Sequence, residues 1–127
     1  LPEGGYAPEV TGLVYAALCR QAAIARRAGY CAIIDAVALR PEERQEFAAV
    51  ARTAGVPFSG LWLAAPAAAL AARLDARRDD ASDATRAVVA RQLEADLGPL
   101  DWRRVDAGGT AAETAAAARQ ALAEGQA

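Results

Sequence analysis

The chain has 127 residues, which is enough for one domain with a buried core. Its formal net charge is -2, so it has no overall basic field that would hold nucleic acid or an anionic membrane. All 14 basic residues are arginine, and the chain contains no His, Lys or Met. These absences exclude a Ser-His-Asp triad, a His-ligated metal site and a lysine-bearing phosphate loop within the chain.

The first half of the chain predicts two helices around a strand. Apolar residues at helical spacing predict a helix over Pro8–Ala28, with Gly29 as its stop. The stretch Tyr30–Ala36, YCAIIDA, is short, apolar on both faces and follows this glycine, which predicts a buried parallel strand. A second helix is predicted over Pro41–Thr53, with Gly55 at its end.

The second half continues the alternation of strands and helices. The pattern predicts a strand over Val56–Ala65, followed by a helix from Pro66 to about Arg78. A further helix is predicted from Ser82 or Asp83 to about Leu97. A weaker strand over Trp102–Ala107 follows, and a last helix runs to about Ala123 after opening with the capping box Thr110–Glu113. The alternation predicts an α/β architecture with a parallel sheet, in one domain over residues 1–127.

The chain shows no segment that would direct it to a membrane or out of the cell. The longest uncharged run, Val56–Ala72, contains two prolines and a glycine, so it is typical of a strand followed by a helix start. No signal-peptide pattern is present. Cys19 and Cys31 lie in apolar settings, which predicts buried, reduced thiols and a cytoplasmic protein.

Asp35 lies near the end of the first predicted strand, after Ile33 and Ile34. In open parallel sheets, ligands bind beyond the carboxyl ends of the strands. An apolar strand that ends in aspartate is typical of the carboxylate that orients magnesium or accepts a proton in phosphoryl transfer. The spacing alone is equally compatible with an aspartate that caps the next turn.

Arg40 and Arg44 share one face at the start of the helix that follows this strand. From there they could reach a ligand above the edge of the sheet. The alternative is a surface pairing with Glu42, Glu43 or Glu46, which the local sequence favours.

A local cationic cluster forms the start of RLDARRDDASDATRAVVARQ, which begins at Arg73. Arg73 and Arg77 are four residues apart on one helix face, and Arg78 follows directly. Guanidinium groups bind phosphate oxygens in a bidentate manner, so the cluster is a candidate phosphate lid. The alternative is a solvated helix end, in which Asp75 and Asp79–Asp80 neutralise these arginines.

The run from Gly29 to Gln92, beginning GYCAIIDAVALRPEER, resembles the second half of P-loop small-molecule kinases. It is most similar to the ATP-binding kinase-like domain in the C-terminal half of bifunctional aminoglycoside phosphotransferase/ATP-binding proteins. That domain is related to gluconate kinases, zeta toxins and polynucleotide kinases. The resemblance extends from Tyr6 to about Ala121. It depends on Asp-Ala after a strand, on R-x-x-x-R followed by Ser-Asp-Ala, and on Gln92 ten residues after Ser82.

The resemblance implies ATP-dependent phosphoryl transfer to a hydroxyl of an unknown small molecule, with ATP and Mg²⁺ as cofactors. It implies that Asp35 is catalytic and lies near the metal, which it would contact through a metal-bound water. The other implied roles are nucleotide phosphate binding in the lid for Arg73, Arg77 and Arg78, lid support for Asp83 and Gln92, and acceptor binding for Tyr6, Tyr15, Arg40 and Arg44.

The chain departs from this family in lacking the first strand, the G-x-x-x-x-G-K-[ST] loop and the first helix. We expect a fragment of a longer protein that is inactive until a P-loop segment is supplied. The family's sheet order, 2-3-1-4-5, implies a partial three-layer fold with strand 1 missing between Ala32–Asp35 and Gly60–Leu63. Such a gap leaves backbone groups unpaired, so we expect a marginal or homo-oligomeric protein. The alternative function is a non-catalytic domain that binds a nucleotide or a protein.

Overall fold

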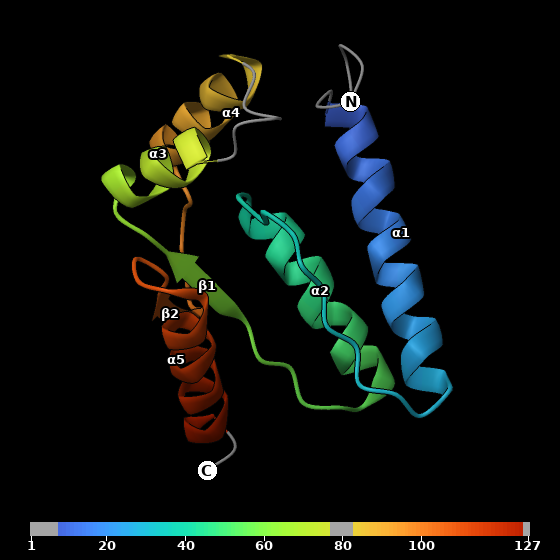
Figure 1. The fold of residues 1–127 in the computed structure, drawn as a ribbon. Helices are drawn as coiled ribbons and strands as arrows, with labels where there is room; N and C mark the ends of the chain where they lie inside the picture. Colours follow the sequence, from blue (N-terminus) through green and yellow to red (C-terminus); the bar gives the residue numbers. More distant parts are fainter. Residues whose placement is uncertain (1–7, 77–82, 126–127) are drawn as a thin grey trace. The chain divides into compact units, whose positions relative to one another are not determined.

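The computed structural model describes residues 8–76 and 83–125, which form five helices and a two-stranded parallel sheet (Figure 1). The chain folds as two compact units, which we call unit 1 (Leu1–Phe58) and unit 2 (Ser59–Ala127). The predicted α/β class and the parallel sheet are confirmed, and the elements agree with a partial P-loop kinase-like fold.

Unit 1 contains two helices, α1 (Pro8–Arg27) and α2 (Pro41–Ala54), which pack against each other. Proline at the first position of a helix costs no hydrogen bond, because that N–H has no partner within the helix. Gly29 and Gly55 follow the two helices with φ of 84° and 63°. Glycine adopts this left-handed conformation without steric cost, and both predicted helix ends are confirmed.

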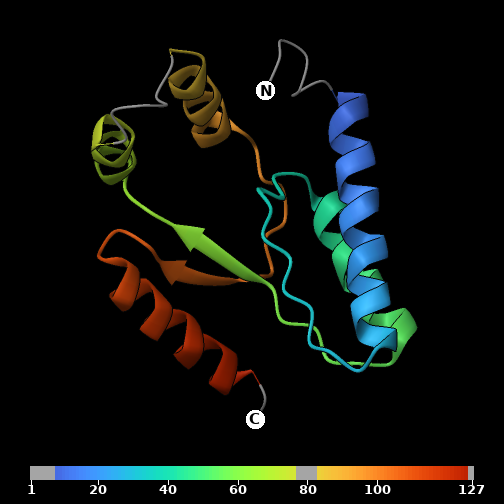
Figure 2. The same cartoon turned by 45° about the vertical axis from the view of Figure 1, so that its right-hand side comes forward.

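The predicted strand at Tyr30–Ala36 is wrong. These residues are extended and link α1 to α2, but they are not part of a sheet. Figure 2 shows this linker as the thin cyan trace beside the helices of unit 1. A strand exists only where a second strand accepts its ladder of hydrogen bonds, and in residues 8–76 and 83–125 the ladder runs between two other segments. The linker leaves Ile33 92% exposed.

The core of unit 1 is small and aromatic. Tyr15 from α1 stacks on Phe47 from α2, with ring centroids 5.4 Å apart and an angle of 13° between the ring planes. Ala22 and Ala51 are also buried. Stacked rings with this separation add about 0.5–1.5 kcal/mol beyond the burial of their surface. The Tyr15–Phe47 pair therefore packs the middle of α2 against α1.

Unit 2 is built on the parallel pair of β1 (Leu61–Ala64) and β2 (Arg103–Asp106). Leu61 is opposite Arg103, and Ala64 is opposite Asp106. The pairing continues past both ends, since Arg103 N–H donates to Gly60 and Ala107 N–H donates to Ala64. The predicted strands at Val56–Ala65 and Trp102–Ala107 are confirmed, although both are shorter than predicted.

Three helices complete unit 2: α3 (Ala67–Ala76), α4 (Asp83–Glu94) and α5 (Ala111–Glu124). Helix α5 packs against β2, whose Val105 is only 2% exposed (Figure 2). The two strands point in the same direction, so β1 leads into α3 and β2 leads into α5 at the same edge of the sheet. This carboxyl edge is the position where open parallel sheets bind ligands.

The predicted capping box at the start of α5 is confirmed. Thr110 accepts from Glu113 N–H with its hydroxyl, and Glu113 accepts from the backbone N–H and the hydroxyl of Thr110. The backbone and side-chain hydrogen bonds from Thr110 lower the pKa of Glu113 below its ordinary value of 4.5. The carboxylate therefore contributes stability above pH 4.5, and this contribution is lost as the pH falls through the lowered pKa.

Replacing Glu113 with glutamine should make the free energy of unfolding of unit 2 depend less on pH under acidic conditions. We expect the chain and the variant to differ at neutral pH and to converge below the lowered pKa of Glu113. Urea unfolding at a series of pH values, followed by tryptophan fluorescence, measures the two profiles. Identical slopes from neutral pH down to a pH below the lowered pKa of Glu113 would show that the capping box has no part in the acid response.

Two further observations concern the thiols and the membrane. Cys19 and Cys31 are both free thiols, but Cys31 is exposed, so its predicted burial is wrong. It lies in the linker that failed to join a sheet, and the error has the same cause.

Among the described helices, none combines the length and the apolar character that a membrane crossing requires.

Candidate functional site

Asp35 lies in unit 1, on the extended linker just before α2, and is exposed. It does not cap α2, because the N-cap of that helix is Arg40. An exposed carboxylate that follows two branched apolar residues is accessible to a ligand or to a hydrated metal ion. Because Asp35 lies on a linker and not in a helix or strand, the position of its carboxylate depends on the conformation of that linker.

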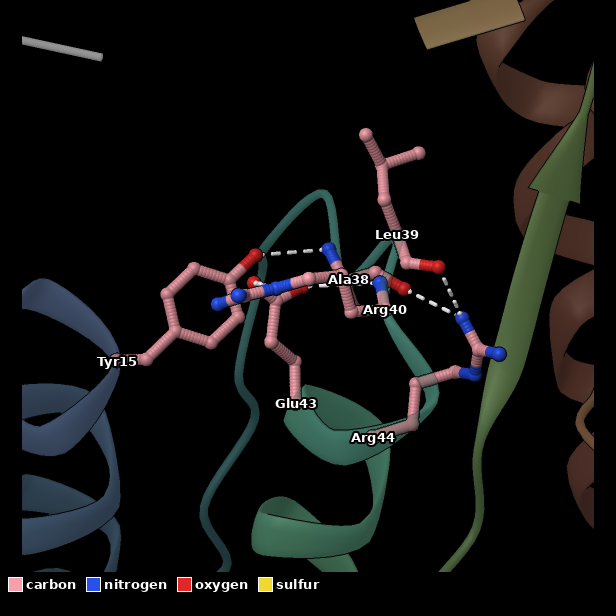
Figure 3. A network of polar contacts seen from close by, with 6 residues as sticks. All are labelled: Tyr15, Ala38, Leu39, Arg40, Glu43 and Arg44. Atoms are coloured by element: carbon pink, nitrogen blue, oxygen red, sulfur yellow. Dashed lines mark hydrogen bonds and ion pairs between the residues drawn. The ribbon is translucent and has the colours of Figure 1, made fainter. Parts of the chain in front are cut away.

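Ala38 and Leu39, just before α2, are held by side chains from both helices of unit 1 (Figure 3). The Tyr15 hydroxyl on α1 accepts a 2.8 Å hydrogen bond from Ala38 N–H. One terminal nitrogen of Arg44 on α2 donates to the carbonyl oxygens of Ala38 and Leu39, at 2.8 and 2.7 Å. Ala38 and Arg44 are only 1% and 3% exposed. The loop between Asp35 and α2 is thus fixed on two sides.

Burial raises the pKa of Tyr15 above its ordinary value of 10.0, although the hydrogen bond from Ala38 N–H acts in the opposite direction. The phenol is therefore neutral at physiological pH. The neutral hydroxyl accepts the hydrogen bond from Ala38 N–H, so this contact does not change within the physiological pH range.

Arg40 forms an ion pair with Glu43, with Nε and Oε1 2.8 Å apart, and its backbone N–H donates to the same carboxylate. The pairing with a nearby glutamate that the sequence favoured is thus confirmed for Arg40. Arg44 differs, because its guanidinium is buried against backbone carbonyls. The acceptor-binding roles of Tyr15, Arg40 and Arg44 remain predictions.

In unit 2, the carboxyl edge of the sheet carries a compact loop between β2 and α5. Asp106 accepts a 2.8 Å hydrogen bond from Gly108 N–H, which turns the chain directly after β2. A side chain at Gly108 would approach Pro66 to 3.0 Å, and one at Gly109 would approach Glu113 to 2.5 Å. A Cβ at either glycine would therefore make Pro66 or the Glu113 carboxylate shift.

Arg73 is tied to this loop. Its Nη2 donates to the carbonyl oxygens of Ala107 and Gly109, both at 2.6 Å, across 34 and 36 positions of sequence. A terminal guanidinium nitrogen carries two protons, so these two acceptors use both of them. Arg73 fixes the last turn of α3 to the loop that follows β2.

The remaining predicted site residues are only partly described. Tyr6, Arg77 and Arg78 lie outside residues 8–76 and 83–125, which are the residues that the structure describes. Asp83 is the first residue of α4, and Gln92 lies on the same helix and is half-buried. The structure thus brings together Tyr15, Arg40 and Arg44 in unit 1, and it places Arg73 and Gln92 in unit 2.

Four further residues take part that were not among the predicted site residues, although Glu43 was one of the glutamates expected to pair with Arg40. Glu43 is buried at 6% exposure and organises Arg40, and its position three residues after the N-cap is the signal of a capping box. Gly108 and Gly109, directly after a predicted strand, signalled a tight turn. Ala38 gave no signal, because alanine does not ordinarily adopt the positive φ of 48° that it has here.

The predicted metal contact fits a single carboxylate. Mg²⁺ in phosphate-transfer sites keeps several waters and takes one or two carboxylates besides substrate phosphates. No three His, Cys, Asp or Glu side chains in the described part of the chain come together to hold a metal ion. The exposed carboxylate of Asp35 is an oxygen donor of the kind that Mg²⁺ takes, and the metal contact remains a prediction.

Comparisons with known proteins identify one family. No curated protein and no solved structure matches the chain. Residues 2–96 match the family model AAA_33, described as an AAA domain, a P-loop nucleotide-binding fold of the kinase type. The match covers most of the chain, including the linker with Asp35, the strand β1 and Arg73 of α3. The chain therefore belongs to this family of P-loop, kinase-like AAA domains.

Proposed function

We propose that this chain is the acceptor and lid portion of an ATP-dependent small-molecule kinase. The family match over residues 2–96 carries the proposal, because it includes both the segment around Asp35 and the arginine-containing sequence that begins at Arg73. The parallel pair β1–β2, with both carboxyl ends at one edge, supports it as the kind of edge at which such folds bind ligands. We expect such a protein to act in the cytoplasm.

In this proposal Asp35 accepts the proton of the acceptor hydroxyl, or orients it, and contacts Mg²⁺ through a metal-bound water. Bound Mg²⁺ would neutralise charge on the nucleotide phosphates. Arg40 is the exposed cation nearest to Asp35 in sequence and is the better candidate for the acceptor, since Arg44 is occupied by backbone carbonyls.

The lid arginines divide into two roles in this proposal. Arg73 would have to release Ala107 and Gly109 before its Nη2 could bind a phosphate. We therefore assign Arg73 to anchoring the lid, and we assign the phosphate contacts to Arg77 and Arg78. Asp83 and Gln92 on α4 would support the other side of the lid.

The chain alone should not transfer phosphate. It contains no lysine, so the lysine-bearing phosphate loop must come from outside these residues. We expect no ADP release when the purified chain is incubated with Mg²⁺, ATP and a panel of hydroxyl acceptors. ATP turnover that is lost in Asp35→Asn would contradict this expectation, because it would show that the chain is complete as a catalyst.

A non-catalytic domain that binds a nucleotide or a protein is the second candidate, and the lack of lysine favours it. The coding sequence ahead of Leu1 separates the two. A G-x-x-x-x-G-K-[ST] motif encoded there supports the kinase, whereas a complete gene without one supports the binding domain.

A further inference from the structure

The loop that joins Asp35 to α2 holds an alanine in a strained conformation. Ala38 has φ of 48°, a value that places its backbone in the left-handed region. For a residue with a Cβ this conformation is sterically unfavourable, and it persists only where the surroundings enforce it. Strain of this kind is concentrated at functional sites.

The surroundings of Ala38 supply that enforcement from two helices. Its N–H donates to Tyr15 on α1, and its carbonyl oxygen accepts from Arg44 on α2. Both polar groups of one residue are thus held, and Arg44 also binds the next carbonyl, that of Leu39. Tyr15 is fixed in turn by its stacking on Phe47. Figure 3 shows the two side chains reaching the loop from opposite sides.

We propose that Tyr15 and Arg44 are positioning residues, which clamp the backbone at Ala38 and so preset the location of the Asp35 carboxylate three residues earlier. The resemblance had implied that both side chains bind the acceptor. Their polar atoms are instead directed at main-chain groups of the loop. The functional meaning of the clamp rests on the proposed kinase activity, but the clamp itself does not.

The clamp is tested in this chain without any activity, by amide hydrogen exchange on wild type, Tyr15→Phe and the control Tyr30→Phe. Tyr15→Phe keeps the ring that stacks on Phe47 and removes only the acceptor for Ala38 N–H. We expect exchange at Ala38 to accelerate about five- to tenfold, while amides in the middle of α2 are unchanged. Tyr30 is exposed, so its variant should match wild type.

Two results would overturn the clamp. Unchanged exchange at Ala38 would show that Tyr15 does not hold the loop. An equal acceleration at Ala38 and throughout α2 would show that Tyr15 merely stabilises unit 1. Arg44→Lys, which keeps a donor on α2, should preserve more of the protection at Ala38 than Arg44→Met, and equal loss in both variants would also count against the clamp.

The effect of the clamp on catalysis is measured in a fusion of this chain with a P-loop segment. We expect Tyr15→Phe to lower kcat there and to leave the KM for the acceptor unchanged, because a displaced Asp35 impairs the chemical step. A raised acceptor KM with kcat unchanged would place the Tyr15 hydroxyl on the acceptor and overturn the positioning role. Absence of turnover in the wild-type fusion would contradict the kinase proposal, and the exchange result would still decide the clamp.

Discussion

Replacing Arg44 with methionine should destabilise unit 1 by about 2–4 kcal/mol. The guanidinium is 3% exposed and donates to the carbonyl oxygens of Ala38 and Leu39. Methionine fills part of the same space but leaves both carbonyls without this donor, and buried polar groups are costly when they lose their partners. The effect is expected to be among the largest of any single substitution in this chain.

The measurement must report on unit 1. Both tryptophans, Trp62 and Trp102, lie in unit 2, so their fluorescence does not follow the unfolding of α1 and α2. Protection of the α2 amides in urea does follow it. Arg52→Met is the matched control, because Arg52 lies exposed on the same helix and its loss should cost no more than about 0.5 kcal/mol. Equal losses in the two variants would contradict the assigned role of Arg44.

A methyl group added at Gly60 should destabilise unit 2 by about 1–3 kcal/mol. A Cβ at this position would lie 2.4 Å from ring atoms of Trp102, which is closer than any real contact, so the indole must move. Gly60 also accepts the hydrogen bond from Arg103 N–H that begins the pairing of β1 with β2. A displaced Trp102 therefore disturbs the start of the sheet.

Gly12→Ala is the control for this substitution. Gly12 lies inside α1, no atom would lie within 4 Å of the added Cβ, and alanine is the better helix former. The same methyl group should therefore stabilise the chain by about 0.5–1 kcal/mol at Gly12. Tryptophan fluorescence during urea unfolding follows unit 2 and measures Gly60→Ala, whereas protection of the α1 amides in urea follows unit 1 and measures Gly12→Ala. An unchanged midpoint for Gly60→Ala would mean that Trp102 moves aside without cost.

Helix ends were predictable because they depend on local chemistry. Proline at position 41, Gly29, Gly55 and the Thr110–Glu113 box each act within a few residues, and each was found where predicted. The linker at Tyr30–Ala36 was not predictable in the same way. Its composition is that of a buried strand, but strand formation depends on a partner, and composition carries no information about whether one is present.

The contacts that organise the candidate site are also long-range. Tyr15 and Ala38 are 23 residues apart, and Arg73 and Ala107 are 34 apart. The sequence identified Arg73 as a candidate for phosphate binding, but its hydrogen-bond acceptors are main-chain carbonyls, which every residue possesses. Only the fold selects among them. For the same reason, the burial of Arg44 could not be distinguished in sequence from the exposure of Arg40.

The most direct test of the proposed kinase function is phosphoryl transfer by the chain fused behind a strand, a G-x-x-x-x-G-K-[ST] loop and a helix. ADP release in the presence of Mg²⁺, ATP and a panel of hydroxyl compounds measures it, with Asp35→Asn as the matched variant. The proposal predicts acceptor-dependent ADP release that falls by about 10²–10⁴-fold in Asp35→Asn. A fusion that binds ATP but phosphorylates no acceptor, or an Asp35→Asn variant as active as wild type, would contradict it.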